Sequence, residues 1–200
     1  MQRTFTLFAA SWAITILAQT SPAQSAEDEN NFVSLFDGKS LDGWVIMNDA
    51  KFAVEDGVIK LSGGRGWLRS DKEYSNFVLR LEVRWLKPKQ DSGIFLRATK
   101  EGKNWPNRRY EVQCENSARV ARIFGASHKR DIPLATKTLK GEPGEWNSYE
   151  VICNGEKCEV KLNDVLVTTS DAFKIPSGHI GFQGEGGLLE FRKVRIKELP

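Results

Sequence analysis

The segment from Phe77 to Trp85 carries the most regular hydrophobic pattern in the chain. Every second residue in it is apolar, and charged residues such as Arg80 and Glu82 lie between them. Side chains of a β-strand point alternately to its two faces. The pattern therefore predicts a strand with one buried face and one solvated face.

Shorter apolar runs predict further strands along the chain. They fall at residues 32–36, 52–54, 58–61, 67–68, 94–97, 110–114, 122–126, 146–153, 158–162, 165–167, 180–183 and 189–199. Asp56-Gly57 is a turn signal that joins two of these runs as a hairpin. In the last run, Phe191 and Val194 differ in parity, which predicts a β-bulge near Arg192-Lys193. Residues 131–144 are polar, contain two prolines, and are predicted to form a long loop.

No window shows a sustained helical period, and the chain has 17 Gly and 7 Pro. Short strands separated by such turn residues are typical of an all-β sandwich or barrel. Most of the six Trp and eleven Phe lie in the predicted strands and supply apolar area for a core between two sheets. The apolar content of 40% and the charged content of 28% are ordinary for a globular chain.

The first 26 residues have the organisation of a signal peptide. Arg3 gives a short basic start, residues 7–18 are apolar without a charge, and small residues follow at Ala23 and Ala26. The apolar run is too short to span a bilayer, and no second run follows. We therefore expect an exported protein, periplasmic or extracellular, with a single domain over residues 27–200 and no stable membrane insertion after leader removal.

The charge balance argues against a nucleic-acid partner. The formal net charge is +3, and removal of residues 1–26 takes away only Arg3, which leaves +2. A nucleic-acid-binding domain normally shows a concentrated basic stripe. The nearest approach to one is the group Arg119, Arg122, Lys129 and Arg130, which we interpret as a solvated loop.

Cys153 and Cys158 flank a four-residue segment that reads as a hairpin loop. This spacing predicts a disulfide across the hairpin, with Cys114 left unpaired. The cysteine and histidine spacings do not resemble a zinc site.

Glu111 and Gln113 stand out among the polar positions. Both lie in the predicted strand at residues 110–114, and their spacing places them on the same face. A solvated sheet face would account for them, as would a cross-strand ion pair between Glu111 and Arg97. A solvated face is the commoner explanation, and a sugar-sized cleft is the functional one. The pair alone leaves these alternatives open.

Nine segments of the chain match a known family in order. They are LFDGKSLDGW at 35–44, VEDGVI at 54–59, NF at 76–77 with the long strand that follows, DSGIFLR at 91–97, YEVQ at 110–113, GEWN at 144–147, LND at 162–164, GHIGFQ at 178–183 and FRKVRI at 191–196. Each segment alone is weak evidence of membership in that family, but the ordered set covers nearly the whole mature chain. On these residues the chain resembles the 3-keto-disaccharide hydrolase domain family.

The resemblance implies a concanavalin A-like jelly roll of two antiparallel sheets, with a ligand cleft on a concave face. It implies carbohydrate chemistry on an oxidised sugar whose C3 hydroxyl has become a ketone. One position departs from the family pattern: many members have His two residues after the Gln of the GHIGFQ-like segment, and this chain has Glu185. The departure bears on catalysis more than on the fold.

Chemistry on such a sugar needs acid–base and hydrogen-bonding groups, and the residues of the chain offer candidates for both. Glu111 and Glu185 are the expected catalytic carboxylates, which could work as a base and an acid or hold a divalent cation between them. The sequence does not identify a metal. The expected substrate-binding residues are Arg97 at the keto oxygen, Gln113 and Gln183 at sugar hydroxyls, Trp105 stacked on a sugar ring, and His128 at the rim. By alternation, Gln183 points away from Phe182, and Arg97 points away from its apolar neighbours.

Two other classes of function remain open on the sequence. A non-catalytic carbohydrate-binding module would need the same face without an acid–base pair. An interaction domain would need no sugar site at all. Convergence of Glu111, Gln113, Gln183 and Glu185 in one groove would favour the two carbohydrate functions, and only turnover of a 3-keto-glycoside would separate those two.

Overall fold

The computed structural model describes residues 31–200, so the predicted signal peptide lies outside the described residues. Residues 32–200 form one compact unit. Between residues 31 and 200, helices of the length and apolar character needed to cross a membrane do not occur.

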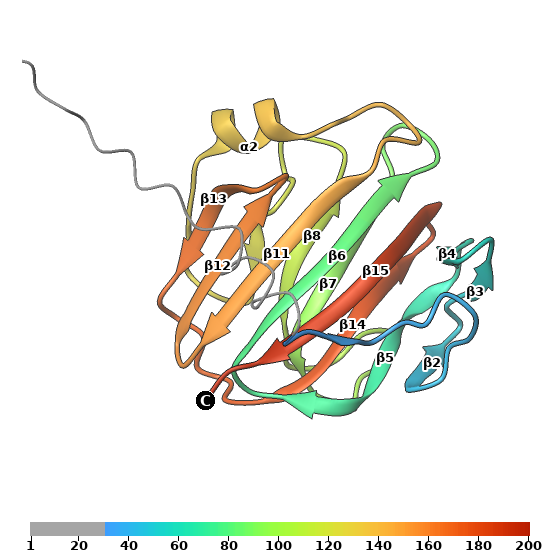
Figure 1. The fold of residues 1–200 in the computed structure, drawn as a ribbon, viewed down its shortest axis with the longest axis horizontal. Coiled ribbons are helices and arrows are strands. Elements are labelled where there is room, and N and C mark those ends of the chain that lie inside the picture. Colours follow the sequence, from blue (N-terminus) through green and yellow to red (C-terminus); the bar gives the residue numbers. More distant parts are fainter. Residues whose placement is uncertain (1–30) are drawn as a thin grey trace, which may run out of the picture. The chain divides into compact units, whose positions relative to one another are not determined.

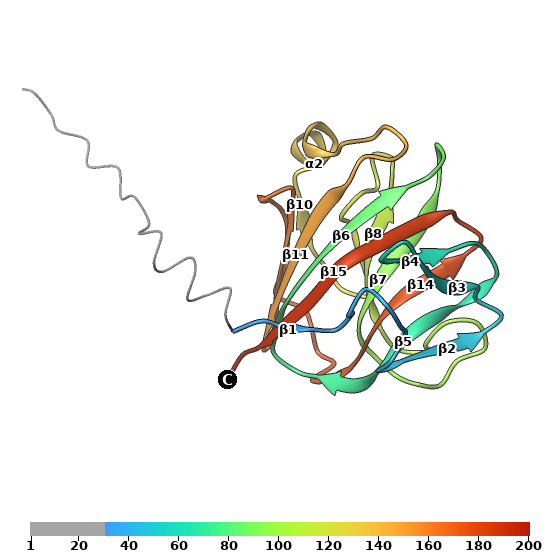
Figure 2. The same cartoon turned by 45° about the vertical axis from the view of Figure 1, so that its right-hand side comes forward.

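Two antiparallel sheets make up this unit, and we call them the large sheet and the small sheet. The large sheet has the order β10 (Lys129–Arg130), β13 (Val165–Ser170), β12 (Lys157–Leu162), β11 (Asn147–Asn154), β6 (Phe77–Trp85), β15 (Leu189–Glu198), β4 (Val58–Leu61) and β3 (Phe52–Glu55), and β1 (Val33–Ser34) pairs with β15. The small sheet has the order β2 (Trp44–Asn48), β5 (Arg65–Tyr74), β14 (Gly178–Glu185), β7 (Asp91–Ala98), β8 (Tyr110–Glu115) and β9 (Ile123–Phe124). In Figure 1, β6, β11 and β15 form the nearer layer, with β7 and β8 behind them. Figure 2 shows the same two layers turned by 45°. The predicted all-β sandwich of two antiparallel sheets is confirmed.

Strand β6 has the alternating burial that its sequence predicts. Its apolar side chains are all buried, whereas the residues between them are partly exposed. It lies between β11 and β15 in the large sheet. The predicted bulge in β15 is present, because the register with β6 shifts between Arg192 and Arg195 and Lys193 has a φ of 52°. The hairpin at Asp56-Gly57 is also confirmed, with positive φ at both residues.

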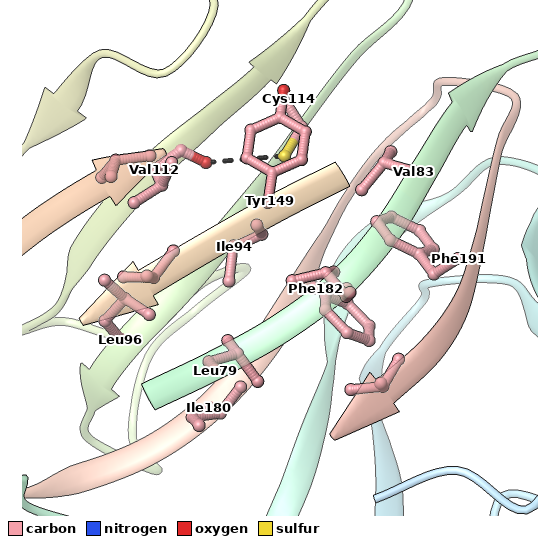
Figure 3. Packing of buried hydrophobic residues seen from close by; sticks show 14 of the residues in the cluster. Leu79, Val83, Ile94, Leu96, Val112, Cys114, Tyr149, Ile180, Phe182 and Phe191 are labelled. Atoms are coloured by element: carbon pink, nitrogen blue, oxygen red, sulfur yellow. Dashed lines mark hydrogen bonds between the residues drawn. The ribbon is translucent and has the colours of Figure 1, made fainter. Parts of the chain in front are cut away.

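The hydrophobic core lies between the two sheets. Phe182 of the small sheet stacks on Phe191 of the large sheet, with ring centroids 4.4 Å apart, and it also stacks on Trp44 at 5.2 Å. Figure 3 shows Phe182 and Phe191 face to face, with Ile94 and Leu79 nearby. A pair of stacked aromatic rings stabilises a core by about 0.5–1.5 kcal/mol beyond the area it buries. These contacts fix the inner face of the small sheet, and with it the direction of the opposite face.

Residues 131–144 do not form the continuous loop that their sequence suggested. They begin with the helix α2 (Ile132–Thr138), which Asp131 caps by accepting a hydrogen bond from the Leu134 amide. Pro133 in the first turn suits a helix start, since its missing N–H would have no partner there. A helix of seven residues is too short to show a period in the sequence.

The predicted Cys153–Cys158 disulfide is absent from the structure. The two cysteines are directly opposite each other in the β11–β12 hairpin, but their Sγ atoms are 3.5 Å apart and both are free thiols. Cys114 is buried and free, as the sequence predicted.

Candidate functional site

The outer face of the small sheet carries a row of polar side chains. Its inner-face residues, among them Ile94 and Val112, are in the core, as Figure 3 shows. Alternation therefore directs Glu111 and Gln113 of β8 outward. Their register partners on β7 are Phe95 and Gly93, and Asp91 pairs with Glu115 one step further along.

Strand β14 adds two more residues to this face. Phe182 points into the core, so Gln183 and Glu185 point outward. On the neighbouring strand β5, Gln183 is opposite Trp67 and Glu185 is opposite Arg65. The outer face thus joins residues from four adjacent strands that are far apart in the sequence.

Part of this face is a hollow of about 270 Å³, which we call the acidic hollow. Its lining residues are Asp91, Arg109, Glu111, Gln113, Arg119, Phe124 and Glu185. A second hollow of about 390 Å³ shares Arg109 and Phe124 with it and is lined otherwise by Asn107, Arg108, Tyr110, Gly125 and Ile175. The first contains three carboxylates, whereas no carboxylate lines the second.

Glu111 is the most deeply buried carboxylate of the acidic hollow, with 5% of its surface exposed. Its Oε2 accepts hydrogen bonds from Nε and Nη2 of Arg109 at 3.3 and 3.2 Å. Burial raises the pKa of Glu111, and the charge of Arg109 opposes that rise without cancelling it. A Cβ at position 93 would lie 2.6 Å from Oε1 of Glu111, so glycine at 93 provides the space that this carboxylate occupies.

Arg109 is held in place by more than this ion pair. Its Nη1 donates to the Pro106 carbonyl at 2.9 Å, and its guanidinium lies over the Phe95 ring, 4.8 Å from the ring centroid. A cation so placed over an aromatic face is further stabilised by the ring quadrupole. The arginine therefore presents a fixed, planar donor group beside Glu111.

Asp91 forms the other end of the polar row. Its Oδ1 accepts a hydrogen bond from Nε2 of Gln113, and its Oδ2 is 3.5 Å from Nη2 of Arg119. Arg119 also pairs with Glu115, at 2.6 Å. Burial, followed by the negative charges of Glu115 and Glu185, raises the pKa of Asp91 to about 6 against the opposing charge of Arg119.

An apolar cluster covers the adjoining part of the outer face. Trp67 and Phe95 pack edge to face with ring centroids 5.7 Å apart, and Trp105 packs against them. The indole N–H of Trp105 donates to the Gly184 carbonyl at 3.3 Å. Asn48 fixes the same loop by donating to the Asn104 carbonyl at 2.9 Å. The loop that carries Trp105 thus lies across β14 and β5.

Three of the residues predicted from the sequence line the acidic hollow together, namely Glu111, Gln113 and Glu185. Gln183 is on the same face but lies beneath the surface, with 3% exposed, and its Oε1 has no hydrogen-bond partner within residues 31–200. Trp105 lies beside the hollow, in the apolar cluster.

Arg97 does not reach this face as predicted. It is 1% exposed, and its guanidinium donates to the carbonyls of Ser75, Gly155 and Ile175 at 2.8 to 2.9 Å. The alternation fails because the register between β7 and β14 shifts here and Arg97 has a φ of 47°. Glu111 therefore pairs with Arg109 and not with Arg97.

His128 is also outside the site. Its Nδ1 is 3.2 Å from the Ala126 carbonyl, and the residue adjoins β10 at the edge of the large sheet. Neither hollow includes it.

The sequence reasoning missed Asp91, Arg109 and Phe124, and it interpreted Arg119 only as part of a solvated loop. Two of them continue the alternation of a predicted strand beyond its expected start. Asp91 is two residues before Gly93, and Arg109 is two residues before Glu111. Arg119 approaches from a loop, and no periodic pattern marks it.

Within residues 31–200, groups of three or more His, Cys, Asp or Glu side chains with the geometry to hold a metal ion are not found. Two carboxylates of the acidic hollow are engaged by neighbouring side chains, Glu111 by Arg109 and Asp91 by Gln113 and Arg119.

Comparison with known proteins agrees with this architecture. The family model of the 3-keto-alpha-glucoside-1,2-lyase-like domain matches residues 31–197. The chain belongs to this family. Nearly all of the described unit is therefore a 3-keto-alpha-glucoside-1,2-lyase-like domain, and the acidic hollow is on its small sheet. No curated protein sequence matches the chain.

Solved structures share the fold of this lyase-like domain. A structure from Parabacteroides distasonis ATCC 8503, provisionally described as a glycosyl hydrolase, has a TM-score of 0.73 at 23% identity and covers 91% of this chain and 99% of its own. A second structure with the same description and source has a TM-score of 0.68 at 24% identity, with 84% and 99% covered. The carbohydrate-binding module CBM66 from Bacillus subtilis has a TM-score of 0.61 at 14% identity, with 78% and 96% covered. At these identities the likeness establishes the jelly-roll fold alone.

Proposed function

We propose that this domain cleaves the glycosidic bond of 3-keto-glycosides in the acidic hollow. The observation that carries the proposal is the pair of Glu111 and Arg109, a buried carboxylate beside a fixed cation in an open hollow. Membership of the lyase-like family supports it, and so do glycosyl hydrolase and carbohydrate-binding neighbours with the same fold.

The chemistry of the substrate determines which groups are needed. A ketone at C3 acidifies the hydrogen at C2, and removal of that hydrogen allows the C1 substituent to leave by elimination. The reaction needs a base at C2 and an electrophilic group at the C3 oxygen. Water can then add to the unsaturated product, which gives net hydrolysis.

Glu111 is the base in this proposal. Its raised pKa makes it a better proton acceptor than an exposed glutamate, while Arg109 keeps it ionised. Both hydrogen bonds that it makes with described residues go to Oε2, which leaves Oε1 for the proton at C2. Its burial restricts the directions in which it can reach the substrate, and glycine at position 93 provides the space that it occupies.

Arg109 replaces Arg97 as the electrophilic group. Its planar guanidinium can donate to the C3 oxygen as negative charge develops on the enolate. The proton that Glu111 accepts neutralises the carboxylate, so the cation is released from its ion pair as the enolate forms. Phe124, which lines both hollows, supplies an apolar surface for a sugar ring.

The test is incubation with a chemically prepared 3-keto-disaccharide and with its unoxidised parent, followed by mass analysis, with and without a chelator. We expect cleavage of the ketone only. Glu111→Gln should abolish cleavage while the protein still unfolds cooperatively. Equal cleavage of the unoxidised parent would contradict the proposal, because a direct displacement at C1 needs no ketone.

The second candidate is a non-catalytic carbohydrate-binding module. The observation in its favour is Glu185, an exposed carboxylate where many family members have His. Such a module would bind a 3-keto-disaccharide, detected by calorimetry, without releasing product. For either function, we propose that the domain acts after export, with the leader removed between Ala23 and Ala26.

A further inference from the structure

We infer that Asp91 is the general acid that protonates the leaving glycosidic oxygen, in place of the Glu185 that the sequence suggested. This inference rests on the proposed function and adds a named catalytic residue to it. The elimination needs a proton donor at the oxygen on C1, because an alkoxide is a poor leaving group.

The order of groups along the hollow matches the order of reacting atoms in the sugar. Arg109, Glu111 and Gln113 follow one another at two-residue spacing on one face of the β8 segment, and Gln113 holds Asp91. A sugar placed with its C3 oxygen at Arg109 and its C2 hydrogen at Glu111 has its C1 oxygen toward Gln113 and Asp91. The glycosidic oxygen thus meets Asp91, a partly buried carboxyl group that lines the hollow.

The surroundings of Asp91 favour a carboxyl group that carries a proton. Gln113 donates to Oδ1, whereas the contact of Arg119 with Oδ2 is long, at 3.5 Å, so Oδ2 is the oxygen that can carry the proton. Glu115 on the same sheet, Glu185 on β14 and Glu111 on β8 all place negative charge near it, and Arg119 is the cation that opposes them. Burial and these carboxylates raise the pKa of Asp91 to about 6, so a useful fraction is protonated near neutral pH.

Glu185 is less suited to this role. Its side chain is exposed at the end of β14, and its register partner is Arg65 on β5. Its charge instead contributes to the protonation of Asp91.

The step balances without a further reactant. The C2–H bond breaks and its proton passes to Glu111, while its electron pair forms the C3 enolate. The enolate then expels the C1 substituent, so that a C1–C2 double bond forms and the C1–O bond breaks. The leaving oxygen keeps the electron pair of that bond and takes the proton from Asp91, and it departs as a neutral alcohol. Proton exchange with water returns both carboxyl groups to their starting states.

The test compares leaving groups of different basicity. Wild-type protein and Asp91→Asn are assayed on 3-keto-glucosides that carry either an alkyl or sugar leaving group or a nitrophenol, which needs no protonation. Asn keeps an oxygen that can accept from Gln113. We expect Asp91→Asn to lower kcat/KM by about 10² to 10⁴-fold for the alkyl and sugar glycosides and by less than about tenfold for the nitrophenyl glycoside. Glu111→Gln is the matched comparison, and it should lower kcat/KM to the same extent for both kinds of glycoside.

An equal loss on both substrates by a folded Asp91→Asn protein would overturn the inference and leave the proposed function intact. Wild-type protein that cleaves neither glycoside would overturn both. If the variant does not fold, the pH profile of the wild-type protein decides. A general acid must be protonated, so kcat for the alkyl glycoside should fall as the pH rises above about 6, and kcat for the nitrophenyl glycoside should not. The same alkaline limb on both substrates would contradict a proton donated by Asp91.

Discussion

The carboxylate of Glu111 occupies the place where residue 93 would have its Cβ. A Cβ at position 93 would be 2.6 Å from both Cγ and Oε1 of Glu111, a separation that real Cβ atoms essentially never show. The two residues are on adjacent strands, with Gly93 opposite Gln113 in the register and Phe95 opposite Glu111. The position of the proposed base therefore depends on the glycine at position 93.

Gly93→Ala should consequently impair cleavage more than folding. The methyl group would displace the flexible end of Glu111, so we expect kcat/KM to fall at least tenfold with a change in unfolding free energy of about 1 kcal/mol or less. Gly141→Ala is the matched control, because a Cβ there meets nothing within 4 Å. Wild-type activity in Gly93→Ala would show that the observed position of Glu111 is not required.

Arg97 should prove structural, contrary to the sugar-binding role expected from the sequence. It satisfies three backbone carbonyls while 1% exposed, and its loss leaves buried acceptors without donors. Each such acceptor costs about 1–3 kcal/mol, so Arg97→Ala should destabilise the fold by about 3 kcal/mol or more in chemical denaturation.

Arg108→Ala is the comparison for Arg97→Ala, since Arg108 is an exposed arginine on the adjoining hollow. Its replacement should change stability by less than about 0.5 kcal/mol. A stable Arg97→Ala protein with weakened sugar binding would contradict the structural role and support the sugar-binding role expected from the sequence.

Asp91→Asn should stabilise the protein at neutral pH. The pKa of this carboxyl is about 6 in the fold against 3.8 for an ordinary aspartate, so the fold prefers the protonated form. The destabilisation from ionised Asp91 is absent below pH 4, grows between pH 4 and 6, and is complete above pH 6.

Asparagine removes that charge, and we expect about 1–2 kcal/mol of added stability at pH 7 after allowance for solvent screening, with the two proteins converging near pH 4. Urea denaturation at a series of pH values measures the added stability at pH 7 and the pH at which the two proteins converge. A variant less stable than wild type at pH 7 would mean that Arg119 stabilises the charged form more than its neighbours oppose it.

The sequence predicts the β-sandwich and part of the candidate site for one physical reason, which is strand alternation. Glu111, Gln113 and Gln183 were assigned to the correct face because their strands are regular around them. Arg97 was misassigned because a shift in register with β14 and its own left-handed φ of 47° interrupt the alternation there.

Other residues of the site were not predicted because they lie at the ends of strands. Asp91 follows a turn at Pro88 and Lys89, and Arg109 begins the segment that leads into β8, so each reads as part of a loop. Helix α2 escaped because seven residues with an internal proline give no helical period. The pairing of Glu111 with Arg109 is a matter of side-chain packing, which no pattern of residues records.

The central claim is that Glu111 removes the C2 hydrogen of a 3-keto-glycoside, and its most direct test follows that hydrogen. A 3-keto-disaccharide is cleaved in D₂O, and the sugar product is examined at C2 by NMR against a blank without protein. The account predicts that wild-type product has lost its original C2 hydrogen, either to a double bond or to deuterium, and that Glu111→Gln returns the intact disaccharide at the exchange rate of the blank. A product that retains its C2 hydrogen, or cleavage by Glu111→Gln at the wild-type rate, would contradict it.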